Sequence, residues 1–403
     1  MTAVTTTPRK HRLALFGLFF LPGLGFASWV GRTPAIRDSL DASTAQMGLI
    51  LLGLSVGAVL GVLAAPLLVR RFGTRAVALA GVAGVLASML SIGLGAASAA
   101  ASAVVVGLLL FGLGMGASEV AMNIDGGVLE RQSRMTVMAP LHGFFSLGSL
   151  CGALLSFGAV AVDLPVLWHL GGVAVLIAVV ALSSVSHMPP GVGVVGIATP
   201  SAGAKKRGSV WSDPILLLIG FIALSMAMAE GTANEWLPLI MVDGRGFSSE
   251  LGSVMFAIFA ATMAVGRFSG TLLVARFGRS AVLVASLVAA AAGMSVVSLI
   301  DVHLFVFPAV ILWALGISLG LPLALSAAAE SGDDPSARVS AVATIGYLAL
   351  LAGPPSLGLL GESFGLRSAI LLPLVLVVTS VLCARVMRPR VVADGVAREA
   401  VHS

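Results

Sequence analysis

The chain has 403 residues, of which 58% are hydrophobic and 10% are charged, and its mean hydropathy is +1.07. Soluble globular chains carry roughly 25% charged residues, so this composition excludes a soluble domain and indicates a polytopic membrane protein. The formal net charge of +5 is small and lies mostly in short turns between apolar segments, which argues against a nucleic-acid partner. Cys151 and Cys383 both fall in apolar segments and are interpreted as packing residues, and we expect neither a metal nor a cofactor.

Apolar segments of about 20 residues, the length that a bilayer requires, follow one another along the chain. Backbone groups in lipid must bond within their own segment, so each segment is predicted to be a helix and the fold class is all-α. The twelve predicted spans are residues 12–33, 45–69, 76–96, 102–127, 136–161, 165–187, 214–241, 250–274, 280–300, 303–325, 338–360 and 367–387.

The longest connection between spans is residues 188–213, which is rich in Pro, Gly and Ser and contains Lys205, Lys206 and Arg207. It separates six spans from six. Asp213 and Pro214 after it read as a helix cap followed by proline at the first helical position. The predicted divisions are an N-terminal half at 1–187, a linker at 188–213, a C-terminal half at 214–388 and a tail at 389–403.

Lys and Arg are distributed unevenly between the two sides of the predicted membrane. Most of the 23 lie on the side of the two termini and the linker, and few lie on the other side. Cytoplasmic loops of membrane proteins carry an excess of Lys and Arg. We therefore predict that both termini and the linker are cytoplasmic.

The two halves carry an internal repeat. The pattern LLVxRFG ends the second span at residues 67–73 and returns 205 residues later at 272–278. A pair of glycines four residues apart in the fourth span recurs, 204 residues later, in the tenth. The repeat indicates duplication of a six-helix half, which is a known transporter architecture with its site between the halves.

With twelve spans, a cytoplasmic linker and RFG turns after spans 2 and 8, the whole chain resembles the major facilitator superfamily. The family's loop pattern is Gly-x-x-x-Asp-Arg-x-Gly-Arg-Arg or Lys, and here Pro66 and Arg70 stand in place of the Gly and the Asp, while Ala275 replaces the acid of the second copy. The resemblance implies a gating role for these loops, and Arg267 is expected near the inner end of span 8 as part of the gate scaffold. The positions that match the pattern are Arg71, Gly73 and Arg75 in the first copy, and Arg276, Gly278 and Arg279 in the second.

A narrower resemblance is to the fucose-permease-like bacterial branch of that family. The short motifs that carry it are Gly116-x-x-Glu119-x-x-x-Asn123, His142-Gly143-x-x-Ser146-x-Gly148, Glu230-Gly231, Glu235-Trp236, Gly266-Arg267 and Gly353-Pro354-Pro355. The resemblance implies a bacterial inner-membrane protein in which spans 1, 4, 7 and 10 line a central cavity. It also implies a proton-carrying acid on span 4, where Glu119 is the matching position. The proline of the usual antiporter motif on span 5 is missing, which favours uptake.

Polar residues four apart share a helix face, so Glu119 with Asn123 and Glu230 with Asn234 form two polar patches in cavity-lining spans. A carboxylate in hydrocarbon is costly, and burial favours the protonated form. We predict that Glu119, Glu230 and His142 take part in proton coupling and that the two asparagines contact substrate. The alternative is a neutral Glu, or a carbonyl-bonded His, that only fixes helix packing.

Aromatic side chains that face the cavity would stack on a sugar or on another organic ring. The alternative for each is helix packing or a place in the interfacial belt. Glu235 is expected closer to the outer surface, in contact with solvent. The aromatic candidates are Phe26, Trp29, Trp236, Trp313 and Tyr347.

The sequence favours a secondary transporter that moves a small organic solute, preferably a sugar-like one, by alternating access. We expect its transport to be coupled to protons by symport. Proton-driven export of drugs or metabolites with the same fold stays an alternative. No Gly-x-x-x-x-Gly-Lys-Ser/Thr loop is present for ATP, and the six scattered histidines supply no catalytic spacing. The expected partners are the solute, protons and the lipid bilayer, and one chain supplies both halves, so a monomer is complete.

Overall fold

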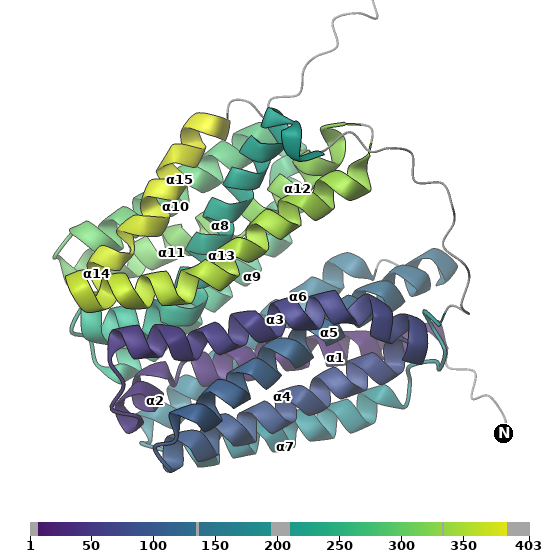
Figure 1. The fold of residues 1–403 in the computed structure, drawn as a ribbon, viewed down its shortest axis with the longest axis horizontal. Helices are drawn as coiled ribbons and strands as arrows, with labels where there is room; N and C mark the ends of the chain where they lie inside the picture. Colours follow the sequence, from purple (N-terminus) through teal and green to yellow (C-terminus); the bar gives the residue numbers. More distant parts are fainter. Residues whose placement is uncertain (1–6, 134–136, 195–209, 333, 385–403) are drawn as a thin grey trace, which may run out of the picture.

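The computed structural model describes residues 7–133, 137–194, 210–332 and 334–384. Lys205, Lys206 and Arg207 and the predicted tail 389–403 lie outside these residues. The helices are α1 (Pro8–Val30), α2 (Thr33–Ser39), α3 (Thr44–Phe72), α4 (Thr74–Ala97), α5 (Ala101–Ser133), α6 (Met138–Ala161), α7 (Val166–Val185), η1 (Val210–Ser212), α8 (Pro214–Leu239), η2 (Ile240–Gly244), α9 (Ser249–Phe277), α10 (Arg279–Leu299), η3 (His303–Phe305), α11 (Val306–Ile317), α12 (Gly320–Glu330), α13 (Pro335–Phe364), α14 (Leu366–Ala369) and α15 (Leu371–Cys383) (Figure 1).

The described residues contain twelve helical segments that are long and apolar enough to cross a membrane, and they contain no strand. The predicted all-α, twelve-span fold is therefore confirmed. The tenth span is broken, because α11 ends at Ile317 and α12 begins at Gly320. Pro322 explains the break, since its nitrogen cannot donate to the carbonyl of Ser318 and its ring clashes with that carbonyl.

Helices α1 to α7 pack as one bundle and α8 to α15 as a second bundle (Figure 1). Small residues set how closely the helices approach. A Cβ atom on Gly57 of α3 would lie 2.1 Å from the carbonyl oxygen of Leu109 in α5, and one on Gly61 would lie 2.4 Å from that of Leu113. Such backbone contact is the packing mode typical of membrane helices.

The RFG turns of the two halves have the same backbone. Gly73 has φ 83° and ψ 163°, and Gly278 has φ 78° and ψ 154°. This region is essentially restricted to glycine. In each half the glycine ends one spanning helix and begins the next, which agrees with the proposed repeat.

The two bundles touch at one end of the molecule and diverge at the other (Figure 1). We name the end where α3 begins and α13 ends the closed end, and the end where α7 ends and α8 begins the linker end. At the closed end a Cβ on Gly48 of α3 would lie 2.7 Å from the carbonyl oxygen of Pro354 in α13. Arg37 of α2 pairs there with Asp243 of η2, and the Ser253 hydroxyl donates to the carbonyl of Gly31 over 3.2 Å.

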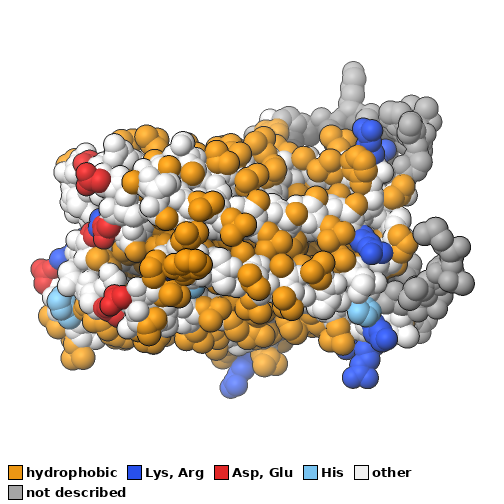
Figure 2. Space-filling model, turned by 90° about the horizontal axis from the view of Figure 1, so that it is seen from below, with side chains coloured by type: hydrophobic (Ala, Val, Ile, Leu, Met, Phe, Trp, Pro, Cys, Tyr) orange, Lys and Arg blue, Asp and Glu red, His pale blue; other side chains and the backbone are white. Residues whose placement is uncertain are grey.

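Charged side chains are also divided between the two ends. In Figure 2 blue Lys and Arg side chains gather mainly at the linker end, red Asp and Glu side chains gather at the closed end, and hydrophobic side chains cover the surface between them. An apolar band between two charged ends is the surface that a bilayer requires.

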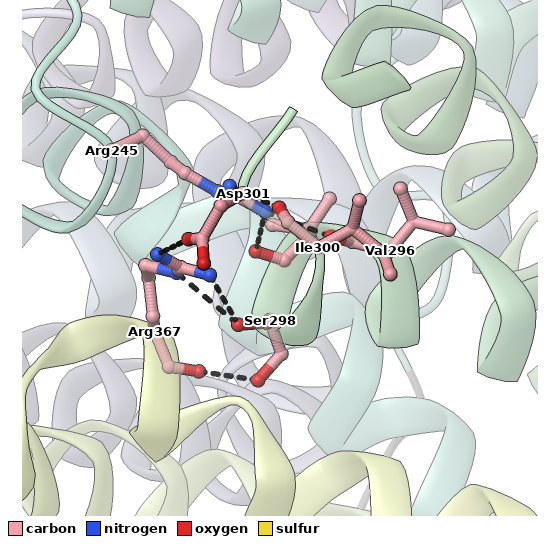
Figure 3. A network of polar contacts seen from close by, with 7 residues as sticks. Arg245, Val296, Ser298, Ile300, Asp301 and Arg367 are labelled. Atoms are coloured by element: carbon pink, nitrogen blue, oxygen red, sulfur yellow. Dashed lines mark hydrogen bonds and ion pairs between the residues drawn. The ribbon is translucent and has the colours of Figure 1, made fainter. Parts of the chain in front are cut away.

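Two arginines anchor the closed end of the C-terminal bundle (Figure 3). Arg245, which follows η2, donates to the carbonyls of Ile300 over 2.5 Å and Val296 over 2.8 Å. Arg367 of α14 donates to the carbonyl of Ser298 over 3.0 Å and pairs with Asp301. Both guanidinium groups satisfy carbonyls at the carboxyl end of α10, where positive charge is favourable. We assign this network to stability.

Asp213 caps α8, as the sequence predicts, and its Oδ2 accepts from Nη2 of Arg338 at 2.5 Å. This Arg338 bond, together with the N–H groups of Ile215 and Leu216, holds the pKa of Asp213 below its ordinary value. A lowered pKa stabilises the fold above the unfolded-state value of about 3.9, and the effect is lost as the pH falls through the folded-state value.

Replacing Asp213 with alanine should lower the thermal midpoint of the purified protein, because losing an N-cap costs about 0.5–2 kcal/mol. The difference from wild type should be constant near neutral pH and should shrink only below about pH 4. Asp213→Asn, which keeps a capping group without the charge, is the matched control. A difference that shrinks between pH 8 and pH 6 would show that another group is responsible.

Candidate functional site

A cavity of about 310 Å³ lies between the two bundles. Its walls are largely apolar, with a few polar groups on α3, α6, α8, α9 and α13. The apolar lining residues are Phe26, Leu54, Ala58, Met115, Phe145, Ala227, Phe256, Phe259, Ala260, Met263, Leu321, Leu325, Ala343 and Leu350, and the polar ones are Ser55, Ser146, Ser149, Glu230, Asn234, Glu235, Arg267 and Tyr347. A mainly apolar pocket with a few placed polar groups is typical of a small-molecule site.

Arg267 of α9 is the centre of the polar groups in this cavity. Its Nη2 lies 2.7 Å from Oε1 of Glu230 on α8, and its Nη1 donates to the Ser146 hydroxyl on α6 over 3.3 Å. The Arg267 side chain is 30% exposed and that of Glu230 is 18% exposed. Arg267 therefore joins the two halves inside the cavity, because α6 belongs to one bundle and α9 to the other.

This placement corrects the sequence-based position of Arg267. We expected the residue near the inner end of span 8 as part of the gate scaffold, but it lines the cavity and holds Glu230. The position of Arg267 along the helix indicates how deep it lies in the membrane, but it does not indicate which side of the helix the side chain occupies. A sequence signal for the Arg267–Glu230 pair did exist. Charged residues inside membrane spans usually pair with one another, and Arg267 is a single arginine within a span while other spans contain acids.

Glu119 and Asn123 lie on α5, and both side chains are partly buried. Neither is among the residues that line the 310 Å³ volume. Glu119 is nevertheless close enough to Arg267 for an electrostatic interaction, and it acts in the same way on Tyr347. Oδ1 of Asn123 is buried without a partner among the described residues. Glu119 thus belongs electrostatically to the group around Arg267.

His142 is on α6, one helical turn before Ser146, and its side chain is exposed. Its ring packs edge-on against Phe19 of α1, with 5.1 Å between ring centroids. Arg267 also acts electrostatically on this histidine. Of the predicted proton-coupling residues, Glu230 pairs with Arg267, and Glu119 and His142 are close enough to it for an electrostatic interaction.

Of the residues predicted to contact substrate, Asn234 of α8, Phe26 of α1 and Tyr347 of α13 line the cavity. Tyr347 is the only tyrosine of the chain. These three side chains come from both bundles and supply an amide, a hydroxyl and two aromatic rings. They can contact an organic solute that has both polar and apolar parts.

The three tryptophans lie outside the cavity lining, so the cavity gives no support to their predicted contact with substrate. Trp29 and Trp236 are 1% exposed and Trp313 is 0% exposed, and none lines the cavity. Trp29 packs against Phe26 and Trp313 against Phe259, each behind a phenylalanine that does line the cavity. They support the cavity walls from within each bundle.

Glu235 also differs from its sequence-based placement. We expected a solvated residue near the outer surface, but its side chain is 3% exposed and reaches the cavity wall. Among the described residues, its Oε2 atom is buried without a hydrogen-bond partner. The position of Glu235 near the outer end of the helix suggested contact with solvent, but α13 packs over this position and buries the side chain.

The loop residues of the family pattern lie at the linker end. Arg71 and Arg276 are exposed and pack over the rings of Phe72 and Phe277, their neighbours in sequence. Arg75 donates to the carbonyl of Met188 over 3.4 Å. These loop residues are not part of the cavity lining, and their gating role stays a prediction.

The sequence comparison agrees with this fold. The family model described as the Major Facilitator Superfamily matches residues 14–349. An uncharacterized MFS-type transporter of Yersinia pestis is 29% identical over 354 residues, which covers 87% of this chain and 89% of the relative.

Solved structures share the fold at low sequence identity. A bacterial homolog of the human lysosomal transporter Spinster, in an inward-facing and occupied conformation, aligns with TM-score 0.71 and 14% identity, over 93% of this chain and 96% of that one. FucP in the outward conformation aligns with TM-score 0.61 and 16% identity, over 94% and 98%. At such identity these likenesses show the fold alone.

Two helical bundles around a central cavity define the chain as a multi-pass membrane transporter rather than an enzyme. It belongs to the Major Facilitator Superfamily, which confirms the family expected from the sequence.

Proposed function

We propose that this transporter couples the movement of a small amphipathic organic solute to protons and works by alternating access. The observation that carries the proposal is the group in the cavity, where Arg267 holds Glu230 and Ser146 and acts on Glu119. One guanidinium that faces two carboxyl groups can change partner when one of them gains a proton. Such a change alters the contact between the halves, because Ser146 belongs to the other bundle.

The orientation follows from the charges. Basic side chains gather at the linker end (Figure 2), and an excess of Lys and Arg marks the cytoplasmic side. We therefore infer that the linker end faces the cytoplasm and that the bacterial inner membrane surrounds the apolar band. With this orientation the closed end faces outward, and we infer that the cavity opens toward the cytoplasm, where the two bundles diverge (Figure 1). We propose that the halves 1–187 and 214–388 rock about the cavity, and that a monomer is sufficient.

The substrate class follows from the walls. Most lining residues are apolar or aromatic, and few polar groups are available to replace the hydration of a sugar with many hydroxyls. A sugar-like solute therefore fits best when it carries an apolar or ring portion, which Phe26 and Tyr347 can contact. The same walls favour a second candidate, proton-driven export of amphipathic drugs or metabolites.

Lightly buffered proteoliposomes or cells that contain the protein test the function through the external pH after addition of solutes. Proton symport should make the outside more alkaline when a substrate enters. Acidification on solute movement would indicate export by antiport instead. Transport that is found by radiolabel without any pH change would contradict proton coupling.

The cavity lining predicts different results for two neighbouring residues. Asn234→Ala should weaken solute affinity by about tenfold, the effect of losing a hydrogen bond worth roughly 1.4 kcal/mol. Trp236→Phe should leave affinity unchanged, because this ring lies outside the cavity. Binding isotherms of the purified protein with a solute found in the pH screen provide the measurement. If Trp236→Phe weakened affinity and Asn234→Ala did not, the solute would bind on the other side of α8, outside this cavity.

A further inference from the structure

Glu235 on α8 is a buried carboxyl group that has no place in the mechanism proposed above. Its side chain is 3% exposed, and its Oε2 atom has no hydrogen-bond partner in the part of the chain that the structure describes. It lies five residues beyond Glu230, which is about 7.5 Å further toward the closed end at 1.5 Å per residue. The two carboxyl groups therefore occupy different depths of one cavity.

The charged and titratable side chains that line the cavity together with Glu235 are Glu230 on its own helix, Arg267 on α9 and Tyr347 on α13, whereas Glu119 on α5 lies outside this lining. Within the described part of the chain, Glu235 has no counter-ion. Arg267 is engaged by Glu230 and Ser146, so it is not available to pair with Glu235. An ionised carboxylate without a partner is costly in an apolar interior. These surroundings therefore stabilise the neutral, protonated acid.

A small void lies on the other side of Glu235. It measures about 10 Å³, close to the size that one water molecule needs, and lies between α8 and α13. Pro354 and Leu357 of α13 also line it. The carbonyl of Pro354 is the group against which Gly48 of α3 packs at the closed end. Glu235 thus lies directly behind the contact that closes the cavity on that side.

We propose that Glu235 is a proton-binding site. The proton is bound while the cavity is open at the linker end, and the site becomes exposed to solvent at the closed end when α3 and α13 separate. The role in transport rests on the proposed proton coupling, but the occupancy of the site does not. Among the residues that the structure describes, Glu230 has a counter-ion and Glu235 has none, so the two carboxyl groups should differ in protonation at the same pH.

Labelling with dicyclohexylcarbodiimide tests the occupancy in the wild-type protein. This apolar reagent adds across the O–H of a protonated carboxyl group, and the adduct is located by mass spectrometry of peptides. At neutral pH Glu235 should be labelled at least about tenfold more than Glu230, which is the internal control with an ion-pair partner. Labelling of Glu230 without labelling of Glu235 would overturn the proposal.

The exposure of the site is tested by weakening the closed end. Arg37→Ala removes the ion pair with Asp243 that joins the halves there. Labelling of Glu235 at pH 8 should then fall by about two- to fivefold, the population shift expected from one partly exposed ion pair. Arg367→Ala, which removes an ion pair with Asp301 at the same end but inside the C-terminal bundle, is the matched control. Equal labelling in both variants would rule out opening on that side.

Each result separates this site from the proposed function. A labelled Glu235 together with solute transport that is independent of pH would contradict proton coupling and leave the protonated site in place. Coupled transport with an unlabelled Glu235 would contradict the site and leave the coupling in place. Glu235→Gln, which has the shape of the neutral acid, should keep the thermal midpoint of the wild type, and a large loss of stability would show that the residue is ionised.

Discussion

Replacing Glu119 with glutamine should abolish uphill, pH-driven transport and should leave exchange of solute between two equal pools. Glutamine keeps the size and the hydrogen bonds of a protonated glutamate but cannot release a proton. Arg267 loses one of the two carboxyl groups between which it can change partner. We expect accumulation to fall by at least about tenfold and exchange to stay within about threefold of wild type, since only exchange needs no net proton movement.

The measurement is uptake of a labelled substrate into proteoliposomes, with and without an imposed pH gradient, beside a counterflow assay. Glu250→Gln is the matched control, because it neutralises a carboxyl group at the amino end of α9, away from the cavity lining. If Glu119→Gln still concentrates solute as the wild type does, the proton is carried elsewhere. Loss of exchange as well would indicate a structural role for Glu119.

The twelve spans could be read from the sequence because hydropathy is a local property that needs only about 20 consecutive residues. The repeat could be read for the same reason, since Gly73 and Gly278 carry a backbone requirement in their own φ and ψ angles. The break between α11 and α12 also has a local signal, which is Pro322. We nevertheless predicted one uninterrupted span at 303–325, because the residues on both sides of this proline are apolar.

For the site residues, the sequence predicted only how deep each one lies in the membrane. Which way a residue faces depends on how each helix is rotated against its neighbours, and close contacts such as Gly57 with Leu109 set that rotation. Successive residues of a helix point about 100° apart, so Asn234 lines the cavity while Trp236 faces the bundle interior. The pairing of Arg267 with Glu230 joins two helices, and spacing along the chain carries no information about it.

Removing the charge of Arg267 should reduce transport more than removing the charge of its partner. Arg267→Gln leaves Glu230 in the cavity without a cation and breaks the contact with Ser146, so two interactions are lost. Hydrogen bonds to charged groups are worth about 1.5–3 kcal/mol each. We expect uptake to fall by about 100-fold for Arg267→Gln and by about tenfold for Glu230→Gln, which keeps Arg267 on Ser146.

The double variant distinguishes an ion pair from two independent contacts. With both charges removed, Glu230 is no longer left as a carboxylate without its cation, so the double variant should transport better than Arg267→Gln alone. Contacting residues show such non-additivity, whereas independent sites add. Initial rates from the four proteins, normalised to the amount of protein in the membrane, give the coupling. Strictly multiplicative losses would mean that Arg267 and Glu230 act separately, and the exchange of partners proposed for this guanidinium would then have to be abandoned.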